Sequence, residues 1–175
     1  MSVNQQTEVA PATTGLSAVL DLLDRAALAI ACVGLVGMAI VQGWQVFARY
    51  VLNDSPSWTE PLALLFMSTT MMLGAACGVR AHRHFGFFIL VETAKPVVRR
   101  VLLAVTSLIA TAIGLMMAIW GAKMVSDSWD FPIAGAPFPQ GVAYLPLTLG
   151  GLLIAIFAVE KLFVPPRQQD PAAPE

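Results

Sequence analysis

The sequence predicts an all-α integral membrane protein with four transmembrane helices and one interfacial amphipathic segment in the loop between the second and third helices. Three observations support this fold class. Hydrophobic residues make up 57% of the 175 residues and charged residues only 12%, which is typical of membrane proteins. The apolar residues form four long runs without charge, and polar segments separate these runs.

The four runs have the length that a membrane-spanning helix requires. Each contains 18 to 23 residues, and at about 1.5 Å of rise per residue such a helix crosses a hydrocarbon core roughly 30 Å thick. The runs lack the alternation of a membrane β-barrel, so helices must satisfy the backbone hydrogen bonds. The predicted spans are residues 26–48, 62–79, 101–122 and 141–159.

Two polar tails flank the predicted membrane domain, residues 17–163. The first tail, residues 1–16, contains no Lys or Arg and so lacks the basic region of a secretory signal peptide. The second tail, residues 164–175, is rich in proline. We expect both tails to be disordered, because neither composition favours a packed core.

The basic residues predict the orientation of the spans. Because consecutive spans alternate in direction, the two tails and the second connection share one side of the membrane. That side holds eight Lys and Arg residues and the other side holds two. Positively charged loops stay in the cytoplasm, so we expect both termini there. The eight are Arg25, Arg80, Arg83, Lys95, Arg99, Arg100, Lys161 and Arg167, and the two are Arg49 and Lys123.

The turn between the first two spans, residues 45–61, carries a distinctive group of polar and aromatic residues. Arg49 lies on the side with few cations, where it needs a carboxylate or lipid phosphate as a partner. One interpretation pairs Arg49 with Glu60. The other leaves Arg49 to the lipid headgroups and Glu60 to the N-terminus of its own helix. Tyr50 and Trp58 are expected at the membrane interface.

Two pairs of small residues are spaced for close helix packing. Gly74 and Gly78 form a G-x-x-x-G pair in the second span, and Gly151 and Ala155 form a similar pair in the fourth. These pairs either pack the four helices against one another or form a docking face for a larger partner.

The other two connections differ in character. The loop between the second and third spans contains five apolar residues flanked by histidines and Lys95, so we expect it to lie along the membrane interface. Residues 129–144 are rich in Pro and Gly and predict an ordered, non-helical turn. Pro146 then falls in the first turns of the last helix, where its missing N–H costs little. The five apolar residues are Phe85, Phe87, Phe88, Ile89 and Leu90.

The spans offer no candidate for catalysis or ion binding. Every Asp, Glu, Lys, Arg and His lies at or beyond a predicted helix end, which disfavours a standalone transporter with its own ion site. His82 and His84 lie in one loop and cannot clamp a haem from opposite faces. Cys32 and Cys77 are expected to pack as small hydrophobes. We therefore predict no enzyme activity and no cofactor, and the lack of a basic cluster predicts no nucleic-acid partner.

Several segments, in a fixed order, carry a resemblance to a known family. With this topology the sequence resembles the small membrane subunit, the DctQ-like or Q subunit, of tripartite ATP-independent periplasmic (TRAP) transporters. The resemblance covers roughly residues 20–163. Its segments are Arg49-Tyr50, Asn53, Ser57-Trp58-x-Glu60, Gly74-Ala75-Ala76, Arg80 with His84, Gly135-Ala136-Pro137, Tyr144-x-Pro146 and Gly150.

The resemblance implies a bacterial inner-membrane subunit that takes part in the uptake of an organic acid. Its implied partners are membrane lipid, a large multi-span permease subunit and a periplasmic substrate-binding protein. The coupling cation, expected to be Na⁺, would bind the large subunit, and the small subunit would serve as a scaffold. A membrane anchor or assembly subunit of an unrelated inner-membrane complex is the alternative that the sequence leaves open.

Two positions depart from the family pattern. Many relatives have an acidic residue where this chain has Pro61, and an acidic residue is common where it has Phe88. The first departure predicts that the second helix begins near Thr59, because proline is tolerated in a first turn. The second makes the interfacial segment more apolar and leaves His84 without a charged neighbour there.

Overall fold

Four long helices make up most of the structure. The computed structural model describes residues 15–54, 56–81 and 96–163. The long helices are α1 (Gly15–Phe47), α2 (Thr59–Arg80), α4 (Pro96–Asp127) and α5 (Leu145–Phe163). Each is associated with one predicted span, and all four are long and apolar enough to cross a membrane. The predicted all-α membrane fold class is therefore confirmed.

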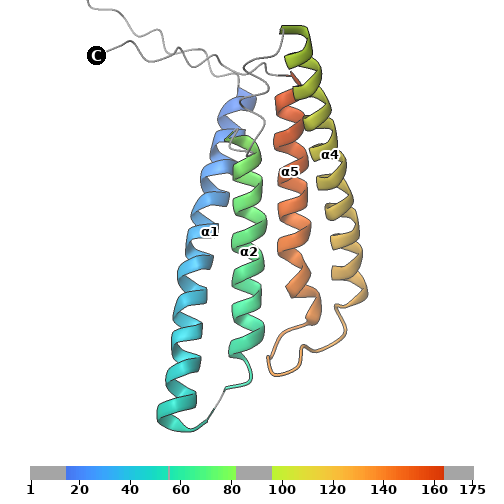
Figure 1. Cartoon of the computed structure of the whole chain (residues 1–175). Helices are drawn as coiled ribbons and strands as arrows, with labels where there is room; N and C mark the ends of the chain where they lie inside the picture. Colours follow the sequence, from blue (N-terminus) through green and yellow to red (C-terminus); the bar gives the residue numbers. More distant parts are fainter. Residues whose placement is uncertain (1–14, 55, 82–95, 164–175) are drawn as a thin grey trace, which may run out of the picture.

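The helices lie side by side in the order α1, α2, α5, α4 (Figure 1). Extensive contacts join α1 to α2, α2 to α5, and α5 to α4. The structure therefore consists of two hairpins, α1–α2 and α4–α5, which meet along the seam between α2 and α5. The edge helices α1 and α4 expose large apolar side chains that suit contact with lipid tails, among them Leu28, Val33, Ile40, Leu108, Ile113 and Met116.

Small residues bring neighbouring helices close together. Between α1 and α2, a methyl group added to Gly34 would lie 2.7 Å from Thr70 Oγ1. Between α2 and α5, a methyl group added to Gly150 would lie 2.5 Å from Met72 Cβ. Both distances are shorter than van der Waals contact, so these seams require glycine.

The pair Gly151 and Ala155 of α5 packs against α4. A methyl group added to Gly114 of α4 would lie 2.8 Å from Gly151 O and 2.7 Å from Ala155 N. For this pair the first interpretation, packing of the four helices on one another, is correct.

The helices extend beyond the apolar runs that predicted them. Helix α1 begins at Gly15 and so includes Asp21 and Asp24, whereas the predicted span began at residue 26. The expectation that every charged residue lies at or beyond a helix end is therefore wrong for α1. The apolar run marks only the part of a helix that lies in lipid, and the backbone hydrogen bonds continue past it.

The first connection begins with a single wide helical turn, Ala48–Leu52, of the π type. Asn53 closes this turn in the left-handed conformation (φ 52°), and its N–H donates to Ala48 O. Helix α2 then starts at Thr59, as the sequence predicts, and Pro61 lies in its first turn. The Thr59 side chain is fully buried, and its hydroxyl donates to Pro56 O at 2.8 Å.

The connection before α5 is ordered but not wholly non-helical. The N–H of Gln140 donates to Phe131 O at 2.8 Å, which closes a compact loop. Residues Gln140–Tyr144 then form a short 3₁₀ helix, so the prediction of a non-helical turn is wrong for its last residues. Pro146 lies in the first turn of α5, as expected. The predicted tails, the interfacial segment and His84 lie outside the described residues, except that Gly15 and Leu16 belong to α1.

Candidate functional site

Arg80, the last residue of α2, joins three helices through its guanidinium group. Its Nη2 donates to Asp21 Oδ1 of α1 at 2.5 Å. Its Nε donates to Glu160 Oε2 of α5 at 3.1 Å, and Nη2 reaches Glu160 Oε1 at 3.4 Å. Nη1 lies 3.6 Å from Asp24 Oδ2. We call these four residues the Arg80 cluster, and this end of the molecule the Arg80 end.

The Arg80 cluster is partly shielded from solvent. The side chains of Arg80 and Glu160 are each 17% exposed. The guanidinium lies over the ring of the fully buried Phe157, 5.5 Å from its centroid. Three carboxylates surround one cation, and Asp24 Oδ1 is buried without a hydrogen-bond partner among the described residues. Loss of Arg80 would therefore leave three carboxylates close together.

Sequence analysis singled out Arg80 but missed its three partners. Asp21 and Asp24 lie between the first tail and the first predicted span, and Glu160 follows the last predicted span. One signal could have found them. Asp21 and Asp24 are spaced to share one face of a helix, and the predicted topology places them with Arg80 and Glu160 at the same membrane surface.

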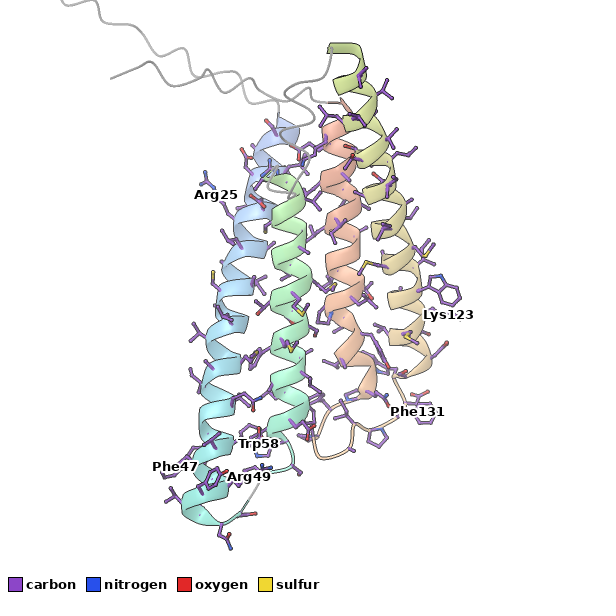
Figure 2. All side chains as sticks on the ribbon, viewed as in Figure 1. Arg25, Phe47, Arg49, Trp58, Lys123 and Phe131 are labelled. Carbon is purple, nitrogen blue, oxygen red and sulfur yellow. The ribbon has the colours of Figure 1, made fainter. Side chains whose placement is uncertain are left out.

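The opposite end, which we call the Trp58 end, carries the predicted interfacial residues. Tyr50 is 81% exposed and Trp58 is 40% exposed. Figure 2 labels Arg49, Phe47 and Trp58 at this end of the molecule. Every ion pair among the described residues involves Arg80. The ion pair of Arg49 with Glu60, one of the two interpretations, is therefore not formed, and contact of Arg49 with lipid headgroups stays a prediction.

The two connections at the Trp58 end contact each other. The hydroxyl of Ser57 donates to Gly135 O at 3.2 Å. Gly135 has a φ of 85°, and a methyl group added to it would lie 2.6 Å from Ser57 O. The Gly135-Ala136-Pro137 segment thus lies against the start of α2. This contact links the ends of the two hairpins into one surface.

The pair Gly74 and Gly78 does not pack against another described helix of the molecule. A methyl group added to either residue would meet no atom of another helix within 4 Å. Ala75, between them in sequence, is exposed. The interpretation that this pair packs the four helices on one another is therefore wrong, and the pair leaves one face of α2 open.

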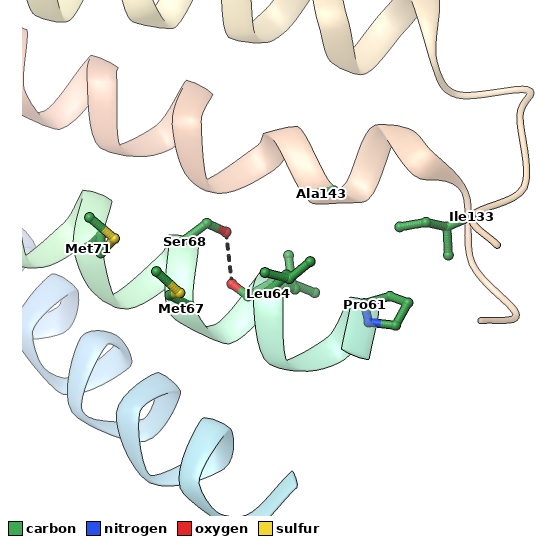
Figure 3. A pocket seen from close by; sticks show the side chains of 8 residues that line it. Pro61, Leu64, Met67, Ser68, Met71, Ile133 and Ala143 are labelled. Carbon is green, nitrogen blue, oxygen red and sulfur yellow. Dashed lines mark hydrogen bonds between the residues drawn. The ribbon is translucent and has the colours of Figure 1, made fainter. Parts of the chain in front are cut away.

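An apolar groove lies along the first half of α2, next to the 3₁₀ helix that precedes α5 (Figure 3). Its volume is about 300 Å³. The hydroxyl of Ser68 donates back to Leu65 O of its own helix at 3.0 Å, so this polar group is already satisfied. The groove therefore suits an apolar occupant. Its lining residues are Pro61, Leu64, Leu65, Met67, Ser68, Met71, Ile133 and Ala143.

Helical spacing places the exposed residues Leu64, Met67 and Met71 on the same side of α2 as Gly74 and Gly78. We call these five residues, with Ala75, the open face of α2.

Among the described residues, no group of three His, Cys, Asp or Glu side chains could hold a metal ion.

Comparisons with known proteins agree with the resemblance that the sequence shows. Residues 38–166 match the family model described as "Tripartite ATP-independent periplasmic transporters, DctQ component". A protein of Haemophilus influenzae that is named as a TRAP transporter small permease protein is 26% identical over 146 residues. The alignment covers 78% of this chain and 85% of that protein. The family match includes α2, α4, α5 and both connections at the Trp58 end.

Proposed function

The chain belongs to the DctQ component family of TRAP transporters, and from this premise we propose that it is the fixed, non-transporting scaffold of an organic-acid importer. As a small permease subunit of this family it is a multi-pass membrane protein. In the proposed complex, a large permease subunit carries the acid and the coupling cation, which we take to be Na⁺. A periplasmic binding protein delivers the acid.

The distribution of charge along the helices supports this division of labour. No charged residue lies between Arg25 and Arg49 of the first helical segment, or between Glu60 and Arg80 of α2. The stretches before Lys123 and before Glu160 are also uncharged over a full span. A carrier of organic anions and cations would be expected to have ionisable groups at mid-membrane depth. This chain is therefore suited to hold a moving partner and not to carry the substrate itself.

Reconstitution into liposomes tests the proposal. We expect the chain alone to take up no organic acid under a Na⁺ gradient, with its binding protein present. We expect the large subunit without this chain to lose most of its uptake, and the two subunits together to restore it. Gradient-driven uptake by this chain alone would contradict the scaffold role.

We place the docking site for the large subunit on the open face of α2. The glycines at the other helix seams are in tight contact, whereas Gly74 and Gly78 touch no neighbouring helix. A glycine inside a helix costs about 1 kcal/mol relative to alanine, and lipid tails gain nothing from it. A transmembrane helix of a partner gains close approach from such a pair. Met67 and Met71, beside the groove, are adaptable side chains that suit a protein contact.

Leucine substitutions test this docking site. Gly74→Leu and Gly78→Leu should each abolish co-purification with the large subunit in mild detergent, while the thermal stability of the isolated chain stays nearly unchanged. Gly43→Leu is the matched control, because Gly43 of α1 also touches no other residue but lies outside the open face. If both α2 variants still co-purify with the large subunit, the docking site lies elsewhere.

We propose that the Trp58 end faces the periplasm and contacts the binding protein. The Ser57–Gly135 contact joins its two connections into one surface, and the exposed Tyr50, Trp129 and Phe131 line it. A photo-crosslinker at Phe131 should capture the substrate-loaded binding protein in the active complex. A lack of crosslinks from all three aromatic positions in an active complex would contradict this contact.

The alternative function is an anchor for an unrelated inner-membrane complex. Family membership disfavours it. Purification in mild detergent separates the two, because a large multi-span permease as partner supports the transporter and an enzyme subunit supports the anchor.

A further inference from the structure

The two hairpins of the molecule meet along a seam that is almost entirely apolar. Gly150 of α5 lies against Met72 of α2. Farther along, one cluster of buried residues closes the seam: Leu20, Ala76, Val79, Ile154, Phe157 and Ala158. In lipid, no hydrophobic driving force holds helices together, because the lipid tails are equally apolar, so the axial position of the hairpins depends on close packing and on polar contacts.

The Arg80 cluster supplies the charged, directional contact at one end of this seam, and the Ser57–Gly135 hydrogen bond joins the connections at the other end. Arg80 binds Glu160 through two nitrogens and two oxygens, a geometry that tolerates little displacement. A shift of α5 along α2 by one turn, about 5.4 Å, would separate these groups. It would leave the Glu160 carboxylate, whose side chain is only 17% exposed, without its cation.

We propose that the Arg80 cluster locks the α1–α2 hairpin and the α4–α5 hairpin in one axial register, and so fixes the shape of the helix layer. The cluster divides into two parts. Asp21 and Asp24 bind Arg80 within the first hairpin. Glu160 alone crosses to the second hairpin. The Arg80–Glu160 contact sets the register, whereas the two aspartates bind Arg80 inside the first hairpin.

The inference concerns the geometry of this chain and does not depend on transport. A fixed register is nevertheless what a scaffold requires, because the open face of α2 and the linked connections at the Trp58 end keep their relative positions only if the hairpins do not slide.

Distance measurement by electron spin resonance on the complete chain in lipid nanodiscs tests the lock. Spin labels at Met71 of α2 and Leu149 of α5, both exposed, report the register in a background with Cys32→Ser and Cys77→Ser. The parent should give one narrow distance distribution. Glu160→Gln, which removes the charge but keeps the shape, should broaden it or add a population displaced by roughly 5 Å.

Asp21→Asn is the matched control, because it removes the same charge from the same cation within one hairpin. It should leave the distribution unchanged, whereas Arg80→Gln should reproduce the effect of Glu160→Gln. A parent-like distribution for Glu160→Gln overturns the proposal, even if Arg80→Gln cannot be purified. Equal broadening in Asp21→Asn and Glu160→Gln also overturns it, since the cluster would then stabilise the molecule without setting the register.

Discussion

At the scale of single residues, the guanidinium of Arg80 does what no other cation could do at its position. It presents donors to two carboxylates on different helices at once, and a planar fork binds a carboxylate through two bonds. Its face meanwhile covers the ring of Phe157. Lysine would supply the charge at a single point and could not reproduce this set of contacts.

Arg80→Lys should therefore destabilise the chain although it conserves the charge. Loss of one charge-assisted hydrogen bond costs about 2 kcal/mol, and we expect a decrease of that size in the free energy of unfolding. Thermal unfolding of the chain in nanodiscs measures it. Asp21→Asn, at a half-exposed carboxylate, should cost about 1 kcal/mol or less. Equal effects of the two substitutions would contradict the importance of the bidentate contact.

Gly135 is the residue that allows the two connections at the Trp58 end to touch. Gly135→Ala places a methyl group 2.6 Å from Ser57 O at a φ of 85°, and the left-handed backbone alone costs about 1 kcal/mol for alanine. We expect faster hydrogen exchange in both connections. Ser57→Ala is the control and should have a smaller effect, because it removes only the hydroxyl contact. Unchanged exchange in Gly135→Ala would show that the connections do not depend on each other.

Sequence reasoning found the positions of many of these residues but few of their contacts. Arg49, Tyr50 and Trp58 could be placed at an interface because charge and aromatic content respond to the membrane itself. The predicted topology brings the members of the Arg80 cluster to one membrane surface, but their contacts could not be predicted, since the hydrogen bonds join residues 59 and 80 positions apart. Sequence left two interpretations open for Arg49 and Glu60, which are close in sequence but do not pair in the structure.

At the scale of helices, three seams are built around glycine, and each has little tolerance for added volume. On α4, Gly114 faces backbone atoms of Gly151 and Ala155, which cannot turn aside as a flexible side chain could. This seam holds the second hairpin together. Helix α2, by contrast, keeps two glycines free of such contacts.

Gly114→Leu should consequently open the α4–α5 hairpin. Overpacking of a well-packed seam costs about 1–3 kcal/mol, and we expect the upper part of that range because the obstacle is backbone. A lower thermal midpoint and aggregation in detergent would report it. Gly43→Leu, at an open position, should behave like the parent. A stable Gly114→Leu variant would show that this seam can separate without cost.

The spans were predictable from sequence because lipid imposes a minimum apolar length on every helix. The ends of the helices were not, because the charged first turns of α1 lie beyond the region that hydropathy describes. The role of Gly74 and Gly78 was also not predictable. A G-x-x-x-G pair has the same sequence whether it packs inside a molecule or remains open to a partner.

At the scale of the whole molecule, the order α1, α2, α5, α4 leaves two broad surfaces on the layer (Figure 1). Sequence could not give this order, because four apolar runs of similar length fit many arrangements. The layer explains why a helix in the middle of the molecule, α2, still has an open face. Such a shape suits a subunit that widens a larger complex.

The distribution of Lys and Arg along the whole chain predicts how the molecule is oriented in the membrane. The predicted topology assigns eight basic residues to the side that holds Arg80 and two to the side that holds Trp58, so the Arg80 end should face the cytoplasm. In a background without Cys32 and Cys77, a cysteine at the exposed Asp54 should react with an impermeant maleimide added to intact spheroplasts. A cysteine at Ala81, at the end of α2, should react only after the membrane is permeabilised. The reverse labelling pattern would show that the molecule has the opposite orientation, with the Arg80 cluster outside. It would also rule out the proposed contact between the Trp58 end and a periplasmic binding protein.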